Sequence, residues 1–436
     1  MRKVANFSFE IDSFRMSAAL EGRQAAAHNR IPVAFNGEGL AYRWSCAMNE
    51  SAEATQTAAV PSNREELLAA ARDLQPLLRE YAAQIETERR LPDVVADRLE
   101  ETGLWRMRRP KEQGGLGLSV RDQVEITSEL GRGCPSTGYM VAMLNGTELF
   151  HAIYSPETQE EFHSDPKARS CVVFRPSSDA RRVEGGWVIS GKWPYATGCM
   201  SATHADVDFW QTDENGVTLG KAFALVPLSE MTIEDTWQVV ALEGTGSFTV
   251  AADEVFVPDA RVSDVKYDGP AFGIGASLNV SSSLVGIAEG MFDAVLAKLA
   301  EEKPIMHTSY RRAMDSPTVQ VNMAEARQVI DGARFHMYRA AETLDDSIAE
   351  ARELTVLERA RARADVGTAS KLVRDACELL LNVAGPSAFQ KSSPIQRYWR
   401  ALQLGSRHGY INYDITREAY GKALLGLDVS TVTEAL

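Results

Sequence analysis

The sequence has few cysteines, and they do not form a recognisable pattern. Its 436 residues include five cysteines, which are Cys46, Cys134, Cys171, Cys199 and Cys377. None of them belongs to a Cys-x-x-Cys pair, and no histidines stand at metal-ligand spacing. The spacing therefore favours neither a disulfide framework nor a zinc site. We expect no metal and a reducing, cytoplasmic environment.

The sequence also lacks long apolar runs and clusters of basic residues. Basic residues number 46 against 60 acidic residues, which gives a formal net charge of −14. Without a block of Lys and Arg, binding to nucleic acid or to an anionic membrane is not expected. No apolar run approaches the ~18 residues that span a bilayer, and the N-terminus lacks the apolar core of a secretory signal. These absences favour a soluble protein.

The chain is long enough for about three domains of ~150 residues each. Residues 1–60 show no periodicity and form an irregular leader with the composition of a linker. A helix is expected to begin at Ser62, which forms a capping-box pattern with Glu65. Pro76 should break this helix, and a second helix should run from Pro92 to near Gly103. The sequence thus predicts a helical N-terminal domain over residues 61–167.

The periodicity changes twice after this helical domain. Over residues 168–268 it alternates, and turn signals at 184–186 and 214–216 separate strand-like runs, which predicts a small antiparallel sheet or barrel. Over residues 269–436 long Ala-rich amphipathic segments predict a C-terminal four-helix bundle, whose wide apolar faces would support subunit association. The predicted fold class is α+β, mostly α.

Three segments in this order resemble one known family. They are GGWVISGKWPYATGCMSATHADV, DTWQVVALEGTGSFTVAADEVFVPDARV, and GPSAFQKSSPIQRYWR with the histidine that follows it. The first resembles the strand that lies against the flavin in the acyl-CoA dehydrogenase superfamily. The other two resemble the oxygenase components of two-component flavin-dependent monooxygenases within that superfamily. The resemblance covers about residues 64–430 and implies an acyl-CoA dehydrogenase-like fold.

The resemblance places a flavin against the first of these segments. Tyr195, Ala196 and Thr197 fall on its flavin-contacting positions, and Phe174 is a further candidate. Trp193, Tyr195 and Thr197 occupy alternating strand positions, so they could share one face and form an aromatic wall with one hydroxyl. The alternative is an ordinary aromatic core stripe.

Other flavin contacts carry over only in part. The loop from Asn382 to Phe389 lies where the superfamily reaches the flavin of a neighbouring subunit; Gly385 is kept there and Asn382 stands for a glutamine. Glu243 occupies a position that is usually arginine, and we expect it to line or approach the flavin site. The residues Gly244-Thr245-Gly246 lack the Lys and the helix of a phosphate loop, so they favour a turn.

The choice between dehydrogenase and oxygenase depends on a carboxylate base. Acyl-CoA dehydrogenation needs one, and the resemblance would place it at Gly409 or near Ala276, where neither residue is acidic. The nearest acidic residues, Asp414 and Glu289, are more than a helical turn away. In the oxygenase branch a histidine on the last helix lies beside the flavin, and His408 falls on that position. An imidazole there could accept a proton or hydrogen-bond the reacting oxygen.

The resemblance therefore implies an oxygenase component that uses reduced FMN (FMNH2) or FADH2, with O2 as co-substrate. Oxygen added at C4a of the reduced flavin would hydroxylate or oxidise a small aromatic or heteroaromatic substrate. Substrate-binding candidates are Tyr139, Thr147 and His151; His151 could replace a family histidine near residue 147, although an ordinary surface position is the favoured alternative for it. The expected partners are a separate NAD(P)H:flavin reductase and, in a homotetramer, copies of this chain. The alternatives are an FAD-dependent acyl-CoA dehydrogenase or oxidase and a non-catalytic scaffold.

The leader gives a first testable prediction. Because residues 1–58 precede the first capped helix and show no core pattern, their deletion should shift the thermal unfolding midpoint by only about a degree or two. Differential scanning calorimetry of the full and shortened chains measures this shift. A large loss of stability, or of the oligomer, would show instead that the leader is structural.

Overall fold

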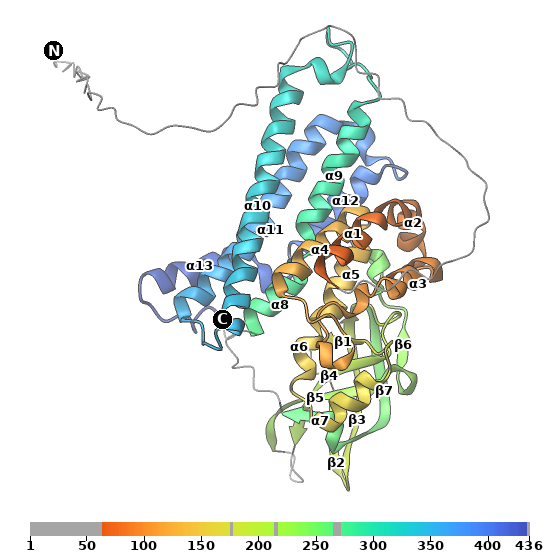
Figure 1. Ribbon diagram of the computed structural model, residues 1–436, viewed down its shortest axis with the longest axis vertical. Coiled ribbons are helices and arrows are strands. Elements are labelled where there is room, and N and C mark those ends of the chain that lie inside the picture. The colour runs from red at the N-terminus through yellow and green to blue at the C-terminus, as the bar shows by residue number, and fades with distance from the viewer. Residues whose placement is uncertain (1–62, 175–177, 213–216, 265–271, 434–436) are drawn as a thin grey trace, which may run out of the picture. The chain divides into compact units, whose positions relative to one another are not determined.

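The computed structural model describes residues 63–174, 178–212, 217–264 and 272–433. These residues follow the predicted order of a helical segment, a β segment and a helical bundle (Figure 1), which confirms the mostly helical α+β class. They belong to one compact unit, so the expected domain boundaries stay predictions. The leader lies outside the described residues.

The helical segment provides one side of the site. Its helices are α1 (Arg64–Asp73), α2 (Gln75–Glu88), α3 (Asp93–Glu101), α4 (Val120–Gly133), α5 (Pro135–Gly146), α6 (Glu148–His151) and α7 (Pro156–Ser164), with short 3-10 turns η1 (Leu104–Arg106) and η2 (Lys111–Gln113). The side chain of Asn63 accepts a hydrogen bond from the Glu66 amide at 3.0 Å. The N-cap of α1 is therefore Asn63 and not the predicted Ser62, which lies outside the described residues. Pro76 lies in the first turn of α2, and the helix break there is confirmed.

The β segment forms two sheets instead of the single sheet or barrel that the alternation suggested. Their strands are β1 (Ser170–Val173), β2 (Ser178–Val183), β3 (Gly186–Ala196), β4 (His204–Thr212), β5 (Thr218–Pro227), β6 (Thr232–Glu234), β7 (Phe248–Pro258) and β8 (Val262–Asp264). The first sheet has the order β1-β4-β5-β8 and the second β2-β3-β7-β6. Neither closes into a barrel over the described strands.

The chain passes between the sheets, which explains why the prediction of one antiparallel sheet was wrong. After β1 the chain leaves the first sheet and forms β2 and β3 in the second sheet. It then returns to the first sheet as β4, which lies beside β1 and parallel to it. The alternation of apolar and polar residues indicates that one face of a strand is buried, but it does not indicate which strand pairs with it. Trp187 of β3 packs on Phe209 of β4, with ring centroids 5.4 Å apart. The two sheets thus share a core.

The C-terminal segment confirms the predicted bundle. Its helices are α8 (Phe272–Ser281), α9 (Leu284–Leu299), α10 (Pro317–Ala349), α11 (Val356–Ala384), α12 (Pro394–Gly405) and α13 (Tyr413–Leu424). The long helices α10 and α11 lie side by side (Figure 1), and α9 packs against α10, α11 and α12. Buried Ala, Leu and Val side chains fill the space between them.

One stretch of this bundle is long and apolar enough, by length and composition, to cross a membrane. It runs from Phe272 to Leu299, and 72% of its apolar window is buried inside the protein. The stretch bends between α8 and α9 at Ser282 and Ser283, both of which are fully buried. Its apolar character is therefore explained by packing in the bundle core.

Candidate functional site

A cavity of about 760 Å³ lies where the helical segment, the β segment and the bundle meet. Its wall includes residues of α5, β1, α8 and α11, the end of β3, and the turn after α12. The lining is mostly apolar, as in binding sites for flat cofactors and small molecules, and the volume is typical of such sites. Six predicted residues line it: Tyr139, Thr147, Phe174, Tyr195, Thr197 and His408.

Tyr195 reaches the cavity because the strand distorts at this point. Its φ is 67°, in the left-handed region that non-glycine residues rarely adopt, and the pairing of β3 with β7 shifts between Trp193 and Ala196. Strain of this kind costs on the order of 1 kcal/mol and often marks functional sites. Tyr195 packs edge-on against Trp237, another lining residue, with centroids 6.1 Å apart.

The expected common face of Trp193, Tyr195 and Thr197 is wrong for the same reason. Trp193 is fully buried, and its Nε1–H donates to the Asp208 carbonyl at 2.8 Å, so its ring belongs to the core between the sheets. Ala196 is fully buried as well. The ordinary core interpretation holds for these two residues, neither of which lines the cavity, while Tyr195 and Thr197 remain candidates for flavin contact.

A chain of hydroxyl groups forms the polar part of this wall. Thr245 donates its proton to the Leu242 carbonyl at 2.8 Å, and its oxygen lies 2.8 Å from Ser247, which lies 3.0 Å from Thr197. Each hydroxyl has a single proton, so with Thr245 donating to Leu242, Ser247 donates to Thr245 and Thr197 donates to Ser247. The Thr197 oxygen is thereby left as an acceptor at the cavity wall.

Thr245 and Ser247 are site residues that were not predicted from the sequence. The segment Gly244-Thr245-Gly246 was predicted to be a turn, and the 3-10 turn η4 (Glu243–Thr245) confirms that prediction. Both hydroxyl residues line the cavity. The available signal was the close spacing of hydroxyl residues in a turn that follows Leu242.

His408 lines the cavity but does not lie on a helix, which corrects the sequence prediction. Helix α12 ends at Gly405, and His408 is the N-cap of the 3-10 turn η8 (Gly409–Ile411). The Tyr410 amide donates to His408 Nδ1 at 3.3 Å, and the two rings stack with centroids 5.7 Å apart. The neutral ring then carries its proton on Nε2. Burial lowers the pKa of His408, which favours this neutral form at pH 7.

The carboxylate that a dehydrogenase needs is not part of this wall. Ala276 and Gly409, the two positions where the resemblance would place it, both line the cavity. No acidic side chain lines it among the described residues. Glu289 is instead held in the bundle by Arg327 and Arg334. The carboxylate base that abstracts a proton from a thioester substrate in a dehydrogenase therefore has no counterpart among the described residues of this wall.

Arg363 is a further lining residue that the sequence did not reveal. It lies in the Ala-rich α11, where an arginine is expected on the surface, yet its exposed fraction is only 4%. Its Nη2 donates to the Tyr410 carbonyl at 3.3 Å, and burial lowers its pKa. Arg363 therefore contacts the turn that carries His408 from the bundle side.

Glu243 approaches the cavity without lining it. Its Oε1 lies 3.0 Å from Nη1 of Arg400, which also bonds Glu86 of α2 and the Val240 carbonyl. Burial raises the pKa of Glu243, and the nearby Glu86 raises it further. Glu243 is thus half of a partly buried ion pair, and its neighbours Leu242 and Thr245 form the wall.

The other three candidates also lie outside the cavity lining. Asn382 is exposed near the end of α11, and Gly385 ends that helix with a φ of 68°. Their expected contact with a neighbouring subunit's flavin stays a prediction. His151 is buried, with its ring nitrogens facing Glu148 and Ser170, so it does not line the cavity as Thr147 does.

Comparison with known proteins places these features in a family. The N-terminal domain of acyl-CoA dehydrogenase matches residues 61–162, and its C-terminal domain matches residues 278–413. The oxygenase subunit HsaA of a flavin-dependent monooxygenase from Mycobacterium tuberculosis is 30% identical over 389 residues, which cover 83% of this chain and 96% of that protein.

A reduced flavin is mentioned in the descriptions of two further relatives, as part of the enzyme's name in one and as a bound ligand in the other. The oxygenase component of FADH(2)-dependent resorcinol hydroxylase from Rhizobium is 29% identical over 81% of this chain and 92% of that protein. The structure of XiaF from Streptomyces in complex with FADH2 and glycerol has a TM-score of 0.80 and 31% identity, covering 84% of this chain and 96% of that chain.

The Glu243–Arg400 pair gives a second prediction. Glu243→Arg would place a new cation beside Arg400 and Arg397, with Glu86 as the remaining carboxylate. It should destabilise the fold by about 2 kcal/mol, since it breaks a partly buried pair, and it should weaken the binding of reduced flavin by displacing the wall at Leu242 and Thr245. Chemical denaturation and anaerobic flavin titration measure the two effects.

Glu161→Arg is a matched control, because Glu161 is 60% exposed and pairs only with Arg261 on the surface. It should cost at most about 1 kcal/mol and leave flavin binding unchanged. If Glu243→Arg behaves like this control, Glu243 is a solvated turn residue.

Proposed function

Because the chain belongs to the acyl-CoA dehydrogenase family, and within it to the oxygenase subunits of flavin-dependent monooxygenases, we propose that it oxygenates a small aromatic or heteroaromatic molecule. The observation that carries this proposal is a flavin-sized cavity with His408 in its wall and with Ala276 and Gly409 where a dehydrogenase base would lie. The relatives are named as monooxygenases and hydroxylases, which leaves a non-catalytic scaffold without support.

The cofactor is a reduced flavin, and FADH2 is the form that we propose. Two relatives support this choice, because FADH2 occurs in the name of the resorcinol hydroxylase and in the complex of XiaF. Bound reduced flavin supplies the two electrons with which one atom of O2 enters the substrate and the other leaves as water. A separate NAD(P)H:flavin reductase would deliver it, as expected for the oxygenase component of a two-component system.

Aromatic side chains at one end of the cavity support an aromatic substrate. Phe150 and Phe174 line the cavity with ring centroids 5.2 Å apart, and Phe174 also lies 6.4 Å from Tyr410. Edge and face contacts of such rings favour a flat aromatic ligand. Tyr139 adds a buried phenol to the wall, and burial raises its pKa, so this group stays protonated.

We propose a cytoplasmic homotetramer as the working form. The bundle leaves large apolar side chains exposed, including Phe335 and Val321 on α10, with exposed fractions of 71% and 61%. Exposed apolar side chains on a long helix favour burial against another subunit. A neighbouring subunit at the α11 end would also give Asn382 and Gly385 their expected flavin contact.

The hydroxyl chain would give the site a preference for the reduced cofactor if the flavin N5 faces Thr197. In the donor order described above, the Thr197 oxygen is an acceptor; a reduced flavin has an N5–H donor, whereas an oxidised flavin has a lone pair at N5. The first pairing is favourable and the second is repulsive. This difference fits a protein that takes up reduced flavin from a reductase and releases it after oxidation.

The third prediction tests this preference. The wild-type protein should purify nearly colourless and bind FADH2 more tightly than FAD in anaerobic titrations. Thr197→Val should reduce that preference about tenfold, because it removes one hydrogen bond of ~1.4 kcal/mol. Thr203→Val is the control, since Thr203 bonds the Arg169 carbonyl and does not line the cavity. A wild-type protein that purifies with stoichiometric FAD, bleached by an acyl-CoA without O2, would support the dehydrogenase alternative.

The role that we propose for His408 is to donate its Nε2 proton to the oxygen being transferred. Loss of such a donor costs ~10² or more in rate. The fourth prediction is that His408→Ala hydroxylates a trial phenol such as resorcinol ~10² more slowly than wild type, while reduced flavin still binds and O2 is still consumed. Hydrogen peroxide should replace the product, which a peroxidase-coupled assay measures.

His408→Gln separates two possible roles of the ring. A glutamine amide can donate a hydrogen bond but cannot accept a proton at neutral pH, so recovery of coupling in this variant supports a donor. No recovery, with peroxide still released, would assign His408 as the base. If His408→Ala hydroxylates the substrate at nearly the wild-type rate, His408 has only a packing role and takes no part in catalysis.

A further inference from the structure

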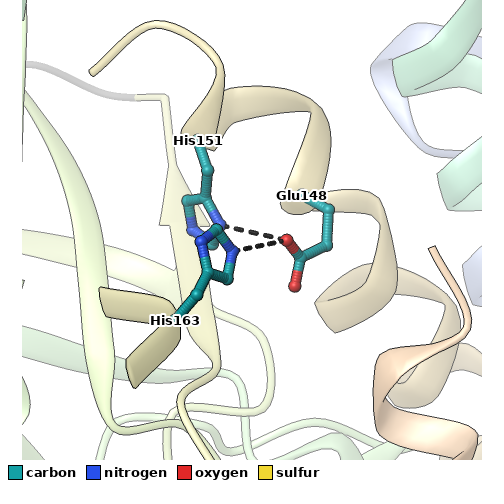
Figure 2. Close-up of side chains that lie close together, drawn as sticks. All are labelled: Glu148, His151 and His163. Atoms are coloured by element: carbon teal, nitrogen blue, oxygen red, sulfur yellow. Dashed lines mark hydrogen bonds and ion pairs between the residues drawn. The ribbon is translucent and has the colours of Figure 1, made fainter. Parts of the chain in front are cut away.

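A second group of potential ligands lies beside the cavity wall. Thr147 and Phe150 line the cavity, whereas Glu148 and His151 of α6 belong with His163 of α7 to a separate cluster. Figure 2 shows both imidazole rings turned toward one carboxylate oxygen of Glu148. The exposed fractions of the three side chains are only 7%, 4% and 4%. Neither the flavin site nor the proposed mechanism uses this cluster.

Two distances in the cluster, those from Glu148 to each histidine, match the edges of a metal coordination shell. Glu148 Oε2 lies 3.3 Å from His151 Nδ1 and 3.1 Å from His163 Nε2, and all three atoms lie within 4.8 Å of one another. Zinc bonds of ~2.0–2.1 Å in tetrahedral geometry separate neighbouring ligand atoms by ~3.3 Å. Two histidines and one carboxylate, with a water in the fourth position, form a familiar zinc ligand set.

The hydrogen bonds of His163 require a cation in this space. Its Nδ1 lies 2.8 Å from the Gln159 carbonyl, which can only accept, so Nδ1 carries a proton. The neutral ring then presents a lone pair from Nε2 toward the carboxylate of Glu148, and two lone pairs repel. Either a second proton or a metal ion must lie between them. A hydrogen bond from Nδ1 to a backbone carbonyl is the usual way to orient a metal-bound histidine.

The other two ligands also have outer partners that would orient them. Arg109 Nε bonds the second oxygen of Glu148 at 3.2 Å, which leaves Oε2 for an ion. His151 Nε2 lies 2.9 Å from the Ser170 hydroxyl and 3.8 Å from Asp206 Oδ2. Asp206 is 1% exposed, and its Oδ2 has no hydrogen-bond partner in the described structure.

This buried oxygen is the second observation that points to a ligand. If His151 binds an ion through Nδ1, its Nε2 must carry the proton and donate it to Ser170. The Ser170 proton then becomes free to turn toward Asp206. The resulting chain of carboxylate, hydroxyl, histidine and metal would give this oxygen a hydrogen-bond donor. Without an ion, a doubly protonated His151 would instead donate from Nδ1 to Glu148 and from Nε2 toward Ser170 and Asp206, so a metal ion and a proton are the two alternatives that the experiment must separate.

We propose that Glu148, His151 and His163 form a structural site for one divalent transition-metal ion, with zinc as the best-fitting ion. The site would join α6 to α7 and hold α6 in position from outside the cavity that Thr147 and Phe150 line. Its ion takes no part in oxygen transfer. This site was not predicted from the sequence, because the ligands are separated by two and eleven residues and resemble no zinc motif.

The fifth prediction is a test with zinc on the full-length, tag-free protein. After chelator treatment and dialysis the protein should bind one Zn²⁺ per chain, measured by competition with a chromophoric chelator and by elemental analysis. Zinc should also raise the unfolding midpoint of the chelator-treated wild type, since it binds only the folded form. Bound Co²⁺ should give the intense visible absorption of a tetrahedral site.

Variants separate this site from adventitious binding. His163→Gln and Glu148→Gln should each weaken zinc binding at least a hundredfold, and Asp206→Asn about tenfold, as is typical of outer partners. The control is His307→Gln, which removes an exposed histidine far along the chain and should leave zinc binding unchanged.

Two outcomes would overturn the proposal. One is a wild-type protein that binds no zinc and whose unfolding midpoint does not respond to zinc. That result would mean that a second proton on His163, and not a metal ion, lies between His163 and Glu148. The other is equal zinc binding by the wild type and His163→Gln. If a variant does not fold, the stoichiometry and the midpoint shift of the wild type still decide between a metal and a proton.

Discussion

The guanidinium of Arg400 joins the three segments that enclose the cavity. From α12 it reaches Glu86 of α2, 314 positions earlier in the chain, and Glu243 of η4, 157 positions earlier. Burial alone would raise the pKa of Glu86, but hydrogen bonds from Arg400 and Arg397 lower it overall, so Glu86 is the carboxylate that the two arginines keep charged. The wall at Leu242 and Thr245 and the turn that follows α12 are therefore fixed relative to each other by charge as well as by packing.

This arrangement explains how the chain can carry a glutamate at a position where the family resemblance leads one to expect arginine. A carboxylate beside a flavin would repel the negative charge of the reduced ring. Glu243 instead points toward Arg400 and forms an ion pair with it, so hydroxyl groups face the cavity. The polar contacts of the wall then come from Thr245, Ser247 and Thr197. Their direction is set by the Leu242 carbonyl, which is a property of the backbone and not of a charged side chain.

The sequence predicted the elements better than the contacts between them. Helical spacing and Pro76 located α1 and α2, and alternation located β3 and β7, because each pattern depends on residues within a few positions. Six residues that the family resemblance predicted for the site, including His408, line the cavity. Trp193 was misplaced because a bulge at Tyr195 reverses the alternation, and Arg363 was missed because no local pattern distinguishes a buried arginine on an Ala-rich helix.

The functional side chains share one reason for being difficult to place from sequence. Tyr195 has a left-handed φ, Thr197 follows the end of β3, and His408 follows the end of α12. Side chains at such positions are aimed by local backbone geometry and by contacts with distant segments, as Arg363 contacts the His408 turn through the Tyr410 carbonyl. Periodicity describes only residues inside regular elements. The chemistry of this cavity therefore depends on the points where the regular elements end, and those points are fixed only when the three segments pack together.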